Sequence, residues 1–245
     1  MNLIYKMNDR YFNTWSHDMA YILGYITADG CVVCNNGKYE LIVVSKDLDV
    51  IEYITDQLEY GGKIGQSSDG CYRVAICRKN VVMDIMAHGI LPRKSWSPVL
   101  PDTPDEYRED IIRGLFDGDG TVYISRDNTK GYTKLASEIS AISKPFLQVV
   151  GGVISKLNGS IPKIYVDPCQ PNKYRLMYAC KESVALYHML YDNCKTYSMG
   201  RKKVKFEEWL VGYKKDIDWG LRSCILCHKK FVALHDNSVK CMNCR

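Results

Sequence analysis

The sequence predicts an α+β fold in which two pseudo-symmetric αββαββα repeats precede a small zinc ribbon. Three observations predict it: a segment that recurs 90 positions along the chain, the same order of helical and strand-like periodicities after each copy, and two close cysteine pairs near the C-terminus. The length of 245 residues leaves room for two modest domains, because domains average roughly 150 residues.

The recurring segment spans residues 20–30 and reappears over residues 110–120. Both copies share a central glycine and a terminal Asp-Gly pair, at Gly24 with Gly114 and at Asp29-Gly30 with Asp119-Gly120. Ser-Lys and Tyr-Arg pairs then follow in the same order, at Ser45-Lys46 and Ser143-Lys144 and at Tyr72-Arg73 and Tyr174-Arg175. The chain is therefore interpreted as two copies of one unit.

Each copy reads as helix, hairpin, helix, hairpin, helix. The repeated segment is helical and ends at glycine, which tolerates the left-handed backbone conformation that often follows a helix. Apolar spacing then predicts helices over residues 47–59 and 146–157, hairpins over 62–78 and 160–179, and further helices over 80–88 and 182–191. The proline-rich residues 91–104 form the linker, so the predicted domains are residues 1–104, 105–217 and 218–245.

Composition excludes several classes of protein. Hydrophobic residues make up 46 % and charged residues 25 %, as in folded globular proteins rather than disordered chains or coiled coils. The N-terminal residues lack the pattern of a secretory leader, and the longest apolar run near them is too short to span a bilayer. With eleven cysteines, this indicates a reducing, intracellular location and no membrane association.

The charge is uneven along the chain. The whole sequence carries 33 Lys+Arg and 28 Asp+Glu, a net charge of +5. Residues 195–245 hold 12 basic and 5 acidic residues, so their charge of +7 leaves −2 on residues 1–194. A basic terminal segment gives weak support to a polyanionic partner, because solvated basic surfaces are common.

Small residues recur one turn apart in both copies of the helical segment, at Gly24 and Ala28 and at Gly114 and Gly118. Glycine inside a helix costs about 1 kcal/mol relative to alanine, so an offsetting gain is needed. Small residues at positions i and i+4 share one face and allow a second helix to approach closely. We therefore expect the two helices to pack against each other.

A carboxylate ends each helix, Asp29 in one copy and Asp119 in the other. The helix C-terminus disfavours an anion by roughly 0.3–1 kcal/mol, and two carboxylates at the ends of parallel helices repel unless a cation lies between them. Oxygen ligands favour Mg²⁺, Mn²⁺ or Ca²⁺, ions that commonly support phosphodiester hydrolysis. For either copy alone, a helix-ending turn without chemistry is the alternative.

The segments ILGYITADG and IRGLFDGDG resemble the two motifs of single-chain LAGLIDADG homing endonucleases, and the resemblance covers about residues 17–215. It implies a saddle of antiparallel strands over the major groove of double-stranded DNA, a long pseudo-palindromic target and a monomeric enzyme. It also implies that Asp29 and Asp119 bind Mg²⁺ or Mn²⁺ for hydrolysis. Thr27 replaces the earlier aspartate of the consensus, which Asp117 keeps; the family does not use that position as a metal ligand, so activity is still expected.

The family also places a basic residue near each scissile phosphate, where it positions water or stabilises developing negative charge. The pattern Gly-Ile-x-Pro-x-Lys-Ser indicates Lys94 for the first half. For the second half, the stretch MGRKKVKF suggests Lys202, with Lys203 nearly as good. A surface lysine without a catalytic role is the alternative at each position.

Strand alternation separates polar from apolar faces, and the polar faces are expected to contact phosphates and guanine edges. The sequence does not show which of these basic residues contact bases and which contact phosphates. The candidate DNA-binding residues, which lie in or beside predicted strands, are Arg73, Lys79, Arg126, Lys130, Lys134, Lys163, Lys173 and Arg175.

The most specific local pattern is a pair of Cys-x-x-Cys motifs separated by thirteen residues, formed by Cys224, Cys227, Cys241 and Cys244. Four thiolates make a closed tetrahedral site for zinc, which is structural because no position stays open. The segment is too short to fold on a hydrophobic core, so zinc would supply its folding energy. A basic ribbon suits an additional DNA contact, with a protein contact as the alternative.

Other functions fit the same scaffold. An RNA maturase, or a DNA-binding regulator that does not cleave, would keep the fold without the chemistry. Both acidic residues are retained, which favours the nuclease. An endonuclease from an intein is disfavoured, because residue 1 is not a cysteine and the sequence does not end in His-Asn. The leading hypothesis is a magnesium-dependent, site-specific endonuclease that cuts both strands of DNA.

Overall fold

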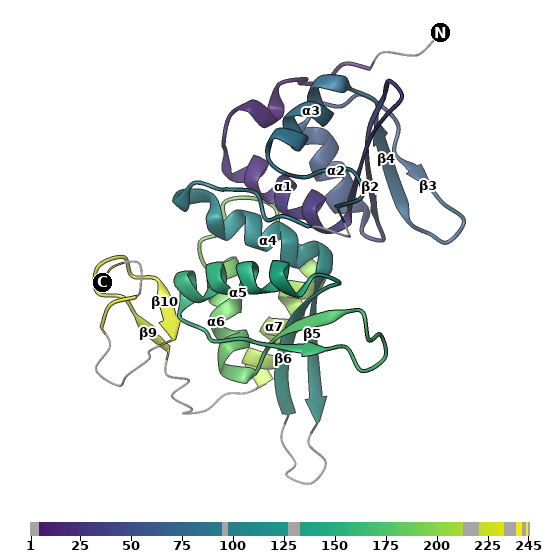
Figure 1. Ribbon diagram of the computed structural model, residues 1–245. Helices are drawn as coiled ribbons and strands as arrows, with labels where there is room; N and C mark the ends of the chain where they lie inside the picture. Colours follow the sequence, from purple (N-terminus) through teal and green to yellow (C-terminus); the bar gives the residue numbers. More distant parts are fainter. Residues whose placement is uncertain are drawn as a thin grey trace. The chain divides into compact units, whose positions relative to one another are not determined.

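A computed structural model describes residues 5–94, 98–126, 133–212, 221–232, 239–241 and 244. Over these ranges the chain forms two four-stranded antiparallel sheets, each covered by helices, and a two-stranded hairpin (Figure 1). This confirms the predicted α+β class and the two αββαββα repeats. The compact units are residues 1–118 with 195–197, and residues 119–194 with 198–245.

The first repeat runs from a short 3₁₀ turn, η1 (Tyr11–Asn13), to helix α3. Its elements are α1 (His17–Asp29), β1 (Gly30–Asn35), β2 (Lys38–Ser45), α2 (Leu48–Gln57), β3 (Gly65–Gln66), β4 (Tyr72–Ile76) and α3 (Lys79–Ala87). The strand order is β1-β2-β4-β3. The Ser16 hydroxyl accepts a hydrogen bond from the Met19 amide at 3.0 Å, which caps the start of α1.

Alternate residues of the first sheet form its buried face. Leu41 and Val43 on β2 lie opposite Ile76 and Val74 on β4, and all four are buried. Helices α2 and α3 contact β2 and cover this face. The period of two along the strands and the helical spacing in residues 48–57 therefore meet in one core.

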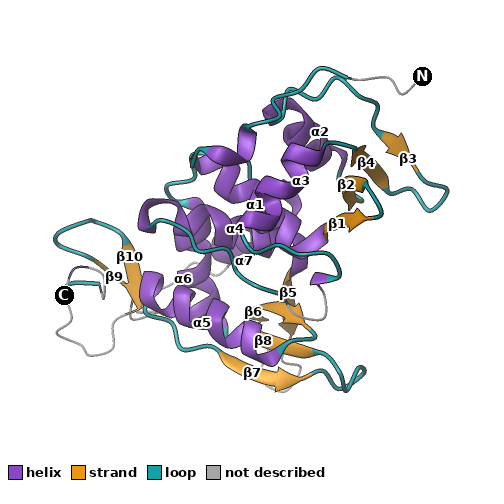
Figure 2. Ribbon diagram, turned by 45° about the horizontal axis from the view of Figure 1, so that its top comes forward, coloured by secondary structure: helices purple, strands orange, loops and turns teal. Residues whose placement is uncertain are grey.

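The second repeat begins with η3 (Asp105–Tyr107) and α4 (Arg108–Asp119). The elements that follow are β5 (Gly120–Arg126), β6 (Thr133–Ala141), α5 (Lys144–Asn158), β7 (Lys163–Val166), β8 (Tyr174–Tyr178), α6 (Cys180–Tyr191) and α7 (Gly200–Gly212). The strand order is β5-β6-β8-β7, which repeats the topology of the first sheet. Helices α5 and α6 cover the buried face of this sheet (Figure 2).

A hairpin of β9 (Leu221–Ser223) and β10 (Lys230–Val232) belongs to the second compact unit. Strand β10 contacts α6 and α5, so the hairpin lies on the helical layer rather than on the sheet. In the described part of the chain, no helix is long and apolar enough to cross a membrane.

Helices α1 and α4, here called the motif helices, pack side by side through their glycines. A Cβ built on Gly24 would collide with the Ile111 carbonyl oxygen and lie 2.9 Å from the Leu115 nitrogen. A Cβ on Gly114 would collide with the Tyr21 carbonyl oxygen. The contacts advance in the same direction along both helices, so the helices are parallel. The expected close packing of the motif helices is confirmed.

Gly114→Ala places a methyl group where the backbone of Tyr21 lies, and backbone cannot rotate away. We expect the free energy of unfolding to fall by about 1–3 kcal/mol, measured by urea denaturation. Gly152→Ala is the matched control, because Gly152 lies in α5 and a Cβ there meets nothing within 4 Å. The control should gain about 0.4–1 kcal/mol. Equal effects of the two substitutions would contradict backbone contact at Gly114.

Candidate functional site

The candidate catalytic carboxylates lie where the motif helices end. Asp29 is the last residue of α1 and is exposed, and Asp119 is the last residue of α4 and is half-buried. A strand begins at the next residue in each case, Gly30 or Gly120. Because no loop intervenes, each carboxylate is held between a helix and a sheet.

The glycine that follows Asp29 has a different role from the one predicted. Gly30 has φ −80° and ψ 151°, which is extended rather than left-handed backbone. A Cβ at Gly30 would lie 2.6–2.8 Å from atoms of Ile26, so lack of space requires glycine here. The predicted left-handed helix end is therefore wrong at this position, and the helix passes directly into a strand.

The end of α4 lies beside Asp29. A Cβ built on Gly118 would collide with the Cβ of Ala28 and lie 3.4 Å from Oδ2 of Asp29. Gly118 immediately precedes Asp119 in the sequence. The second pair of small residues, Ala28 and Gly118, therefore meets at the helix ends that carry the carboxylates.

Lys94 binds the C-terminal end of α1. Its Nζ donates hydrogen bonds to the carbonyl oxygens of Thr27 and Ala28, both at 2.7 Å. These carbonyls belong to the last turn of the helix, where acceptors lack helical partners and the dipole is negative. The ammonium group therefore offsets negative charge at the end of α1 that bears Asp29.

Tyr25 lies beside the candidate carboxylate Asp29, and the sequence analysis did not name it. It lies one turn before Asp29, and its hydroxyl donates a hydrogen bond to the Ser45 hydroxyl at 3.0 Å. Burial, and then the negative charge of Asp29, raise the pKa of Tyr25 well above its usual range. The phenol therefore stays protonated beside the carboxylate. The spacing of four residues on a helix was the available signal.

The structure separates the two lysines proposed for the second half. Lys203 Nζ forms a surface ion pair with Glu207 at 3.8 Å, one turn along α7. Lys202 is 3 % exposed on the same helix, which packs against β5. Strand β5 starts at the residue after Asp119. The two lysines therefore differ in environment, Lys202 being buried and Lys203 paired with Glu207.

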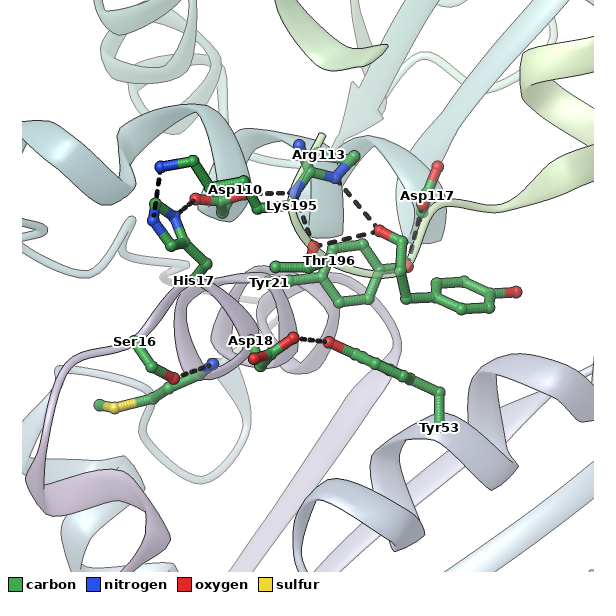
Figure 3. A network of polar contacts seen from close by, with 12 residues as sticks. Ser16, His17, Asp18, Tyr21, Tyr53, Asp110, Arg113, Asp117, Lys195 and Thr196 are labelled. Atoms are coloured by element: carbon green, nitrogen blue, oxygen red, sulfur yellow. Dashed lines mark hydrogen bonds and ion pairs between the residues drawn. The ribbon is translucent and has the colours of Figure 1, made fainter. Parts of the chain in front are cut away.

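A polar network joins the other ends of the motif helices (Figure 3). The Asp110 carboxylate on α4 contacts His17 Nδ1 at 2.6 Å and also pairs with Arg113. The Arg113 guanidinium, 1 % exposed, donates to the Thr196 hydroxyl at 2.6 Å and to the Tyr197 carbonyl oxygen at 3.2 Å. This network fixes the pairing of the helices at the ends remote from Asp29.

The consensus position that differs between the motifs, Thr27 or Asp117, has a structural role in both. Asp117 is 1 % exposed and accepts a hydrogen bond from the Tyr21 hydroxyl on α1 at 2.9 Å. The Thr27 hydroxyl donates to the Leu23 carbonyl oxygen of its own helix at 2.8 Å. Asp117 thus links the two helices, whereas the Thr27 hydroxyl forms its hydrogen bond within its own helix.

The candidate DNA-binding residues divide by position. Outward-facing positions of the sheets, on the side away from the helices, hold Arg73, Lys134, Lys163 and Arg175. Lys173 precedes β8, Lys79 begins α3 over the Tyr39 ring, and Arg126 ends β5 at an inward-facing position of the pleat. Lys130 lies outside the described residues. The sequence pattern therefore identified the strands better than it identified the faces.

The outer face of the second sheet contains a hollow of about 920 Å³. Its lining includes aromatic, basic and sulfur-containing side chains: Tyr123, Lys134, Lys163, Tyr165, Arg175 and Met177. Arg175 has two carboxylate partners, Glu138 at 3.3 Å and Asp167 at 3.7 Å. The lining also includes Glu182 and several apolar side chains, so the hollow combines basic, acidic and apolar groups.

The four C-terminal cysteines form one cluster in the second unit. One sulfur atom from each of Cys224, Cys227, Cys241 and Cys244 lies within 4.8 Å of the others, and the Cys227 and Cys241 sulfurs are 3.6 Å apart. Tetrahedral zinc with bonds of about 2.3 Å separates its sulfurs by about 3.8 Å. Cys224 and Cys241 are buried against Phe231. The donor set and its spacing fit zinc.

The sulfurs titrate unequally. Burial disfavours the Cys224 thiolate, but backbone N–H groups of Cys241, Cys227 and Leu226 outweigh it and lower the pKa to about 6. Hydrogen bonding to Cys241 raises the pKa of Cys244 to about 12. Opposite pKa shifts are expected where neighbouring thiol groups share protons, because two adjacent thiolates repel each other. A divalent cation bound between the sulfurs would relieve that repulsion.

Comparisons with known proteins bear on these sites. A family model described as the LAGLIDADG-like domain matches residues 106–198. The match covers α4 with Asp119 and the whole second sheet, and it ends before α7. A comparison with curated protein sequences found no match.

Several solved structures share the fold of most of this chain. The I-LtrWI LAGLIDADG homing endonuclease bound to target DNA is similar with a TM-score of 0.56 and 12 % identity, over 83 % of this chain and 90 % of that one. I-DmoI in complex with DNA and Mn is similar with a TM-score of 0.50 and 20 % identity, over 71 % of this chain and 97 % of that one. I-SmaMI bound to an uncleaved DNA target with calcium is similar with a TM-score of 0.53 and 13 % identity, over 81 % of this chain and 90 % of that one. The fold is that of single-chain LAGLIDADG homing endonucleases.

Tyr21→Phe removes the hydroxyl that donates a hydrogen bond to Asp117 from the other motif helix. We expect unfolding free energy to fall by about 1.5–3 kcal/mol, because the carboxylate is buried and hydrogen bonds to charged groups are strong. Tyr60→Phe is the matched control, since its hydroxyl donates to the neutral carbonyl oxygen of Ala75 at 3.1 Å and its loss should cost about 0.5–1.5 kcal/mol. Chemical denaturation measures both. A smaller loss for Tyr21→Phe than for Tyr60→Phe would contradict the role of Asp117.

Proposed function

We propose that this chain is a site-specific endonuclease that cuts both strands of DNA with the help of divalent metal. The observation that carries the proposal is the parallel glycine contact of the motif helices, which ends with Gly118 against Asp29. Asp119 is the next residue after Gly118, and we propose that it shares one metal site with Asp29. Two carboxylates there attract divalent cations.

Magnesium is the metal that we propose for the carboxylate site. Asp29 and Asp119 would hold it with water and phosphate oxygens, because Mg²⁺ is usually bound by one or two carboxylates together with substrate oxygens. Bound metal would activate water and neutralise charge on the phosphate. The presence of Mn with I-DmoI and of calcium with I-SmaMI supports a divalent ion.

Lys94 and Lys202 are proposed to serve one strand each. Lys94 lies at the end of α1 beside Asp29, and Lys202 is buried on the helix that packs against the strand after Asp119. Each ammonium would stabilise negative charge on the phosphate that reacts nearby. Tyr25 stays protonated and holds its hydroxyl beside Asp29.

Double-stranded DNA is the proposed substrate, and one chain would suffice because it carries both motifs. The outer faces of the two sheets hold Arg73 in one unit and Lys134, Lys163 and Arg175 in the other. Antiparallel strands with basic outward residues suit the major groove. I-LtrWI and I-SmaMI are bound to DNA in structures of the same fold.

Zinc is proposed to stabilise the C-terminal ribbon. The ribbon offers a small apolar core around Cys224, Phe231 and Cys241, so ligation would supply most of its folding energy. Because β10 contacts α6 and α5, folding of the ribbon also covers part of the helical layer of the second unit. We propose a structural role for this zinc rather than a catalytic one.

Asp29→Asn and Asp119→Asn should each abolish double-strand cutting in Mg²⁺, because the amide removes a negative charge from the metal site. DNA binding should remain measurable. The assay presents a library of candidate double-stranded targets and follows linear products on gels. Asp56→Asn, on the exposed face of α2, is the matched control and should cut normally. Undiminished cutting by both active-site variants would overturn the proposal, and binding without cutting by the native protein would favour a maturase or regulator.

Purified protein should contain one zinc per chain, as measured by elemental mass spectrometry. Cys227→Ser should lose that zinc and lower the melting temperature, because a ligand of the closed site is missing. Cys31→Ser, an exposed strand cysteine, should keep both the zinc and the melting temperature. Retention of zinc by Cys227→Ser would contradict the four-cysteine site.

A further inference from the structure

We propose that Arg175 reads a guanine in the target, and that Glu138 and Asp167 position its guanidinium for that purpose. The inference rests on the proposed function, because it assumes that the outer face of the second sheet meets the major groove. The inference gives the two equivalent arginines different roles: Arg175 recognises a base, and its counterpart, Arg73, contacts the phosphate backbone.

Two carboxylates hold Arg175 from different sides. Its Nη1 donates to Glu138 Oε2 on β6 at 3.3 Å, and its Nε faces Asp167 Oδ2 after β7 at 3.7 Å. Both carboxylates are shielded, with side-chain exposures of 11 % and 17 %. An arginine that is fixed before binding loses less side-chain entropy when the target arrives.

The carboxylates are themselves fixed. Asp167 Oδ1 accepts hydrogen bonds from the backbone amides of Cys169 and Gln170 at 2.8 and 3.1 Å. On the other side, burial and the adjacent Glu138 charge raise the pKa of Tyr123, so its phenol stays neutral against the carboxylate. The guanidinium therefore lies in a rigid frame at the hollow of about 920 Å³ described above.

This frame favours a base edge over a phosphate. A phosphate is an anion, and two nearby carboxylates repel it, which makes the frame a poor phosphate site. Guanine is uncharged and presents two acceptors, O6 and N7, side by side in the major groove. The guanidinium fork has five N–H donors, so contact with the two carboxylates leaves others for that pair of acceptors.

The first repeat supplies the contrast. Arg73 occupies the same place in the Tyr-Arg pair as Arg175, and Glu40 the same place before Ser-Lys as Glu138. Yet Arg73 lies opposite Val44, and Glu40 binds Lys38 at 2.7 Å instead. Among the described residues, the exposed Arg73 forms no ion pair. It has the freedom and the undiminished charge that suit a phosphate contact.

The test compares base preferences of full-length variants. Native protein selects targets from randomised double-stranded DNA in Ca²⁺, and affinity is then measured for each base at each selected position. Arg175→Gln should lose preference at one guanine, where native protein discriminates about 5- to 150-fold, and keep the other positions. Arg175→Lys should keep the charge but weaken the preference at that guanine only in part, because an ammonium group also donates to O6 and N7 without the planar fork; it covers failure of the glutamine variant to fold.

The controls separate positioning from charge. Arg73→Gln should weaken binding to all sequences alike and lower the slope of log affinity against log salt by about 0.9. Glu138→Gln should weaken preference for the same guanine without weakening binding to mismatched DNA, a result that loss of fold would not give. Unchanged base preference in both Arg175 variants would overturn this inference alone. Failure of the native protein to select any sequence would overturn the proposed function and the inference with it.

Discussion

The structure depends on one constraint: the backbones of α1 and α4 touch. Gly24 and Gly114 remove the side chains that would keep the helices apart, and each meets a carbonyl oxygen of the other helix. Direct backbone contact leaves little freedom in the distance or the register of the pair. The same contact continues to Ala28 and Gly118, so it sets where the helices end. The position of Asp29 at the end of α1 follows from this packing and needs no loop to define it.

The charged side chains along α1 and α4 differ in how they are paired. At the beginning of the helices, Asp110 and Arg113 neutralise each other in the interior and tie down residues 196–197. In the middle, Asp117 takes a hydrogen bond from the opposite helix. Only at the far end does an exposed carboxylate, Asp29, stand beside a lysine bound to the helix terminus. The buried charges fix the fold, whereas Asp29 is exposed.

The sequence predicted the repeats, the parallel helix contact and the cysteine cluster, because each depends on the spacing of a few distinctive residue types. It failed where tertiary context decides. Position 30 requires glycine because Ile26 leaves no space for a side chain, and its backbone is extended; no turn rule predicts either. The pairing of Arg175 with Glu138 depends on strand register, in which Arg175 lies opposite Ser140 while Arg73 lies opposite Val44. Tyr25 was missed because tyrosines are common in these strands and helices.

The central claim is that the motif helices bring Asp29 and Asp119 to one metal site. Anomalous scattering from Mn²⁺ in crystals of the protein with a bound DNA target tests it most directly. The account predicts metal peaks about 2.0–2.6 Å from carboxylate oxygens of both residues, beside the phosphates between them. Peaks that contact one of these residues while the other faces away from the DNA would contradict it.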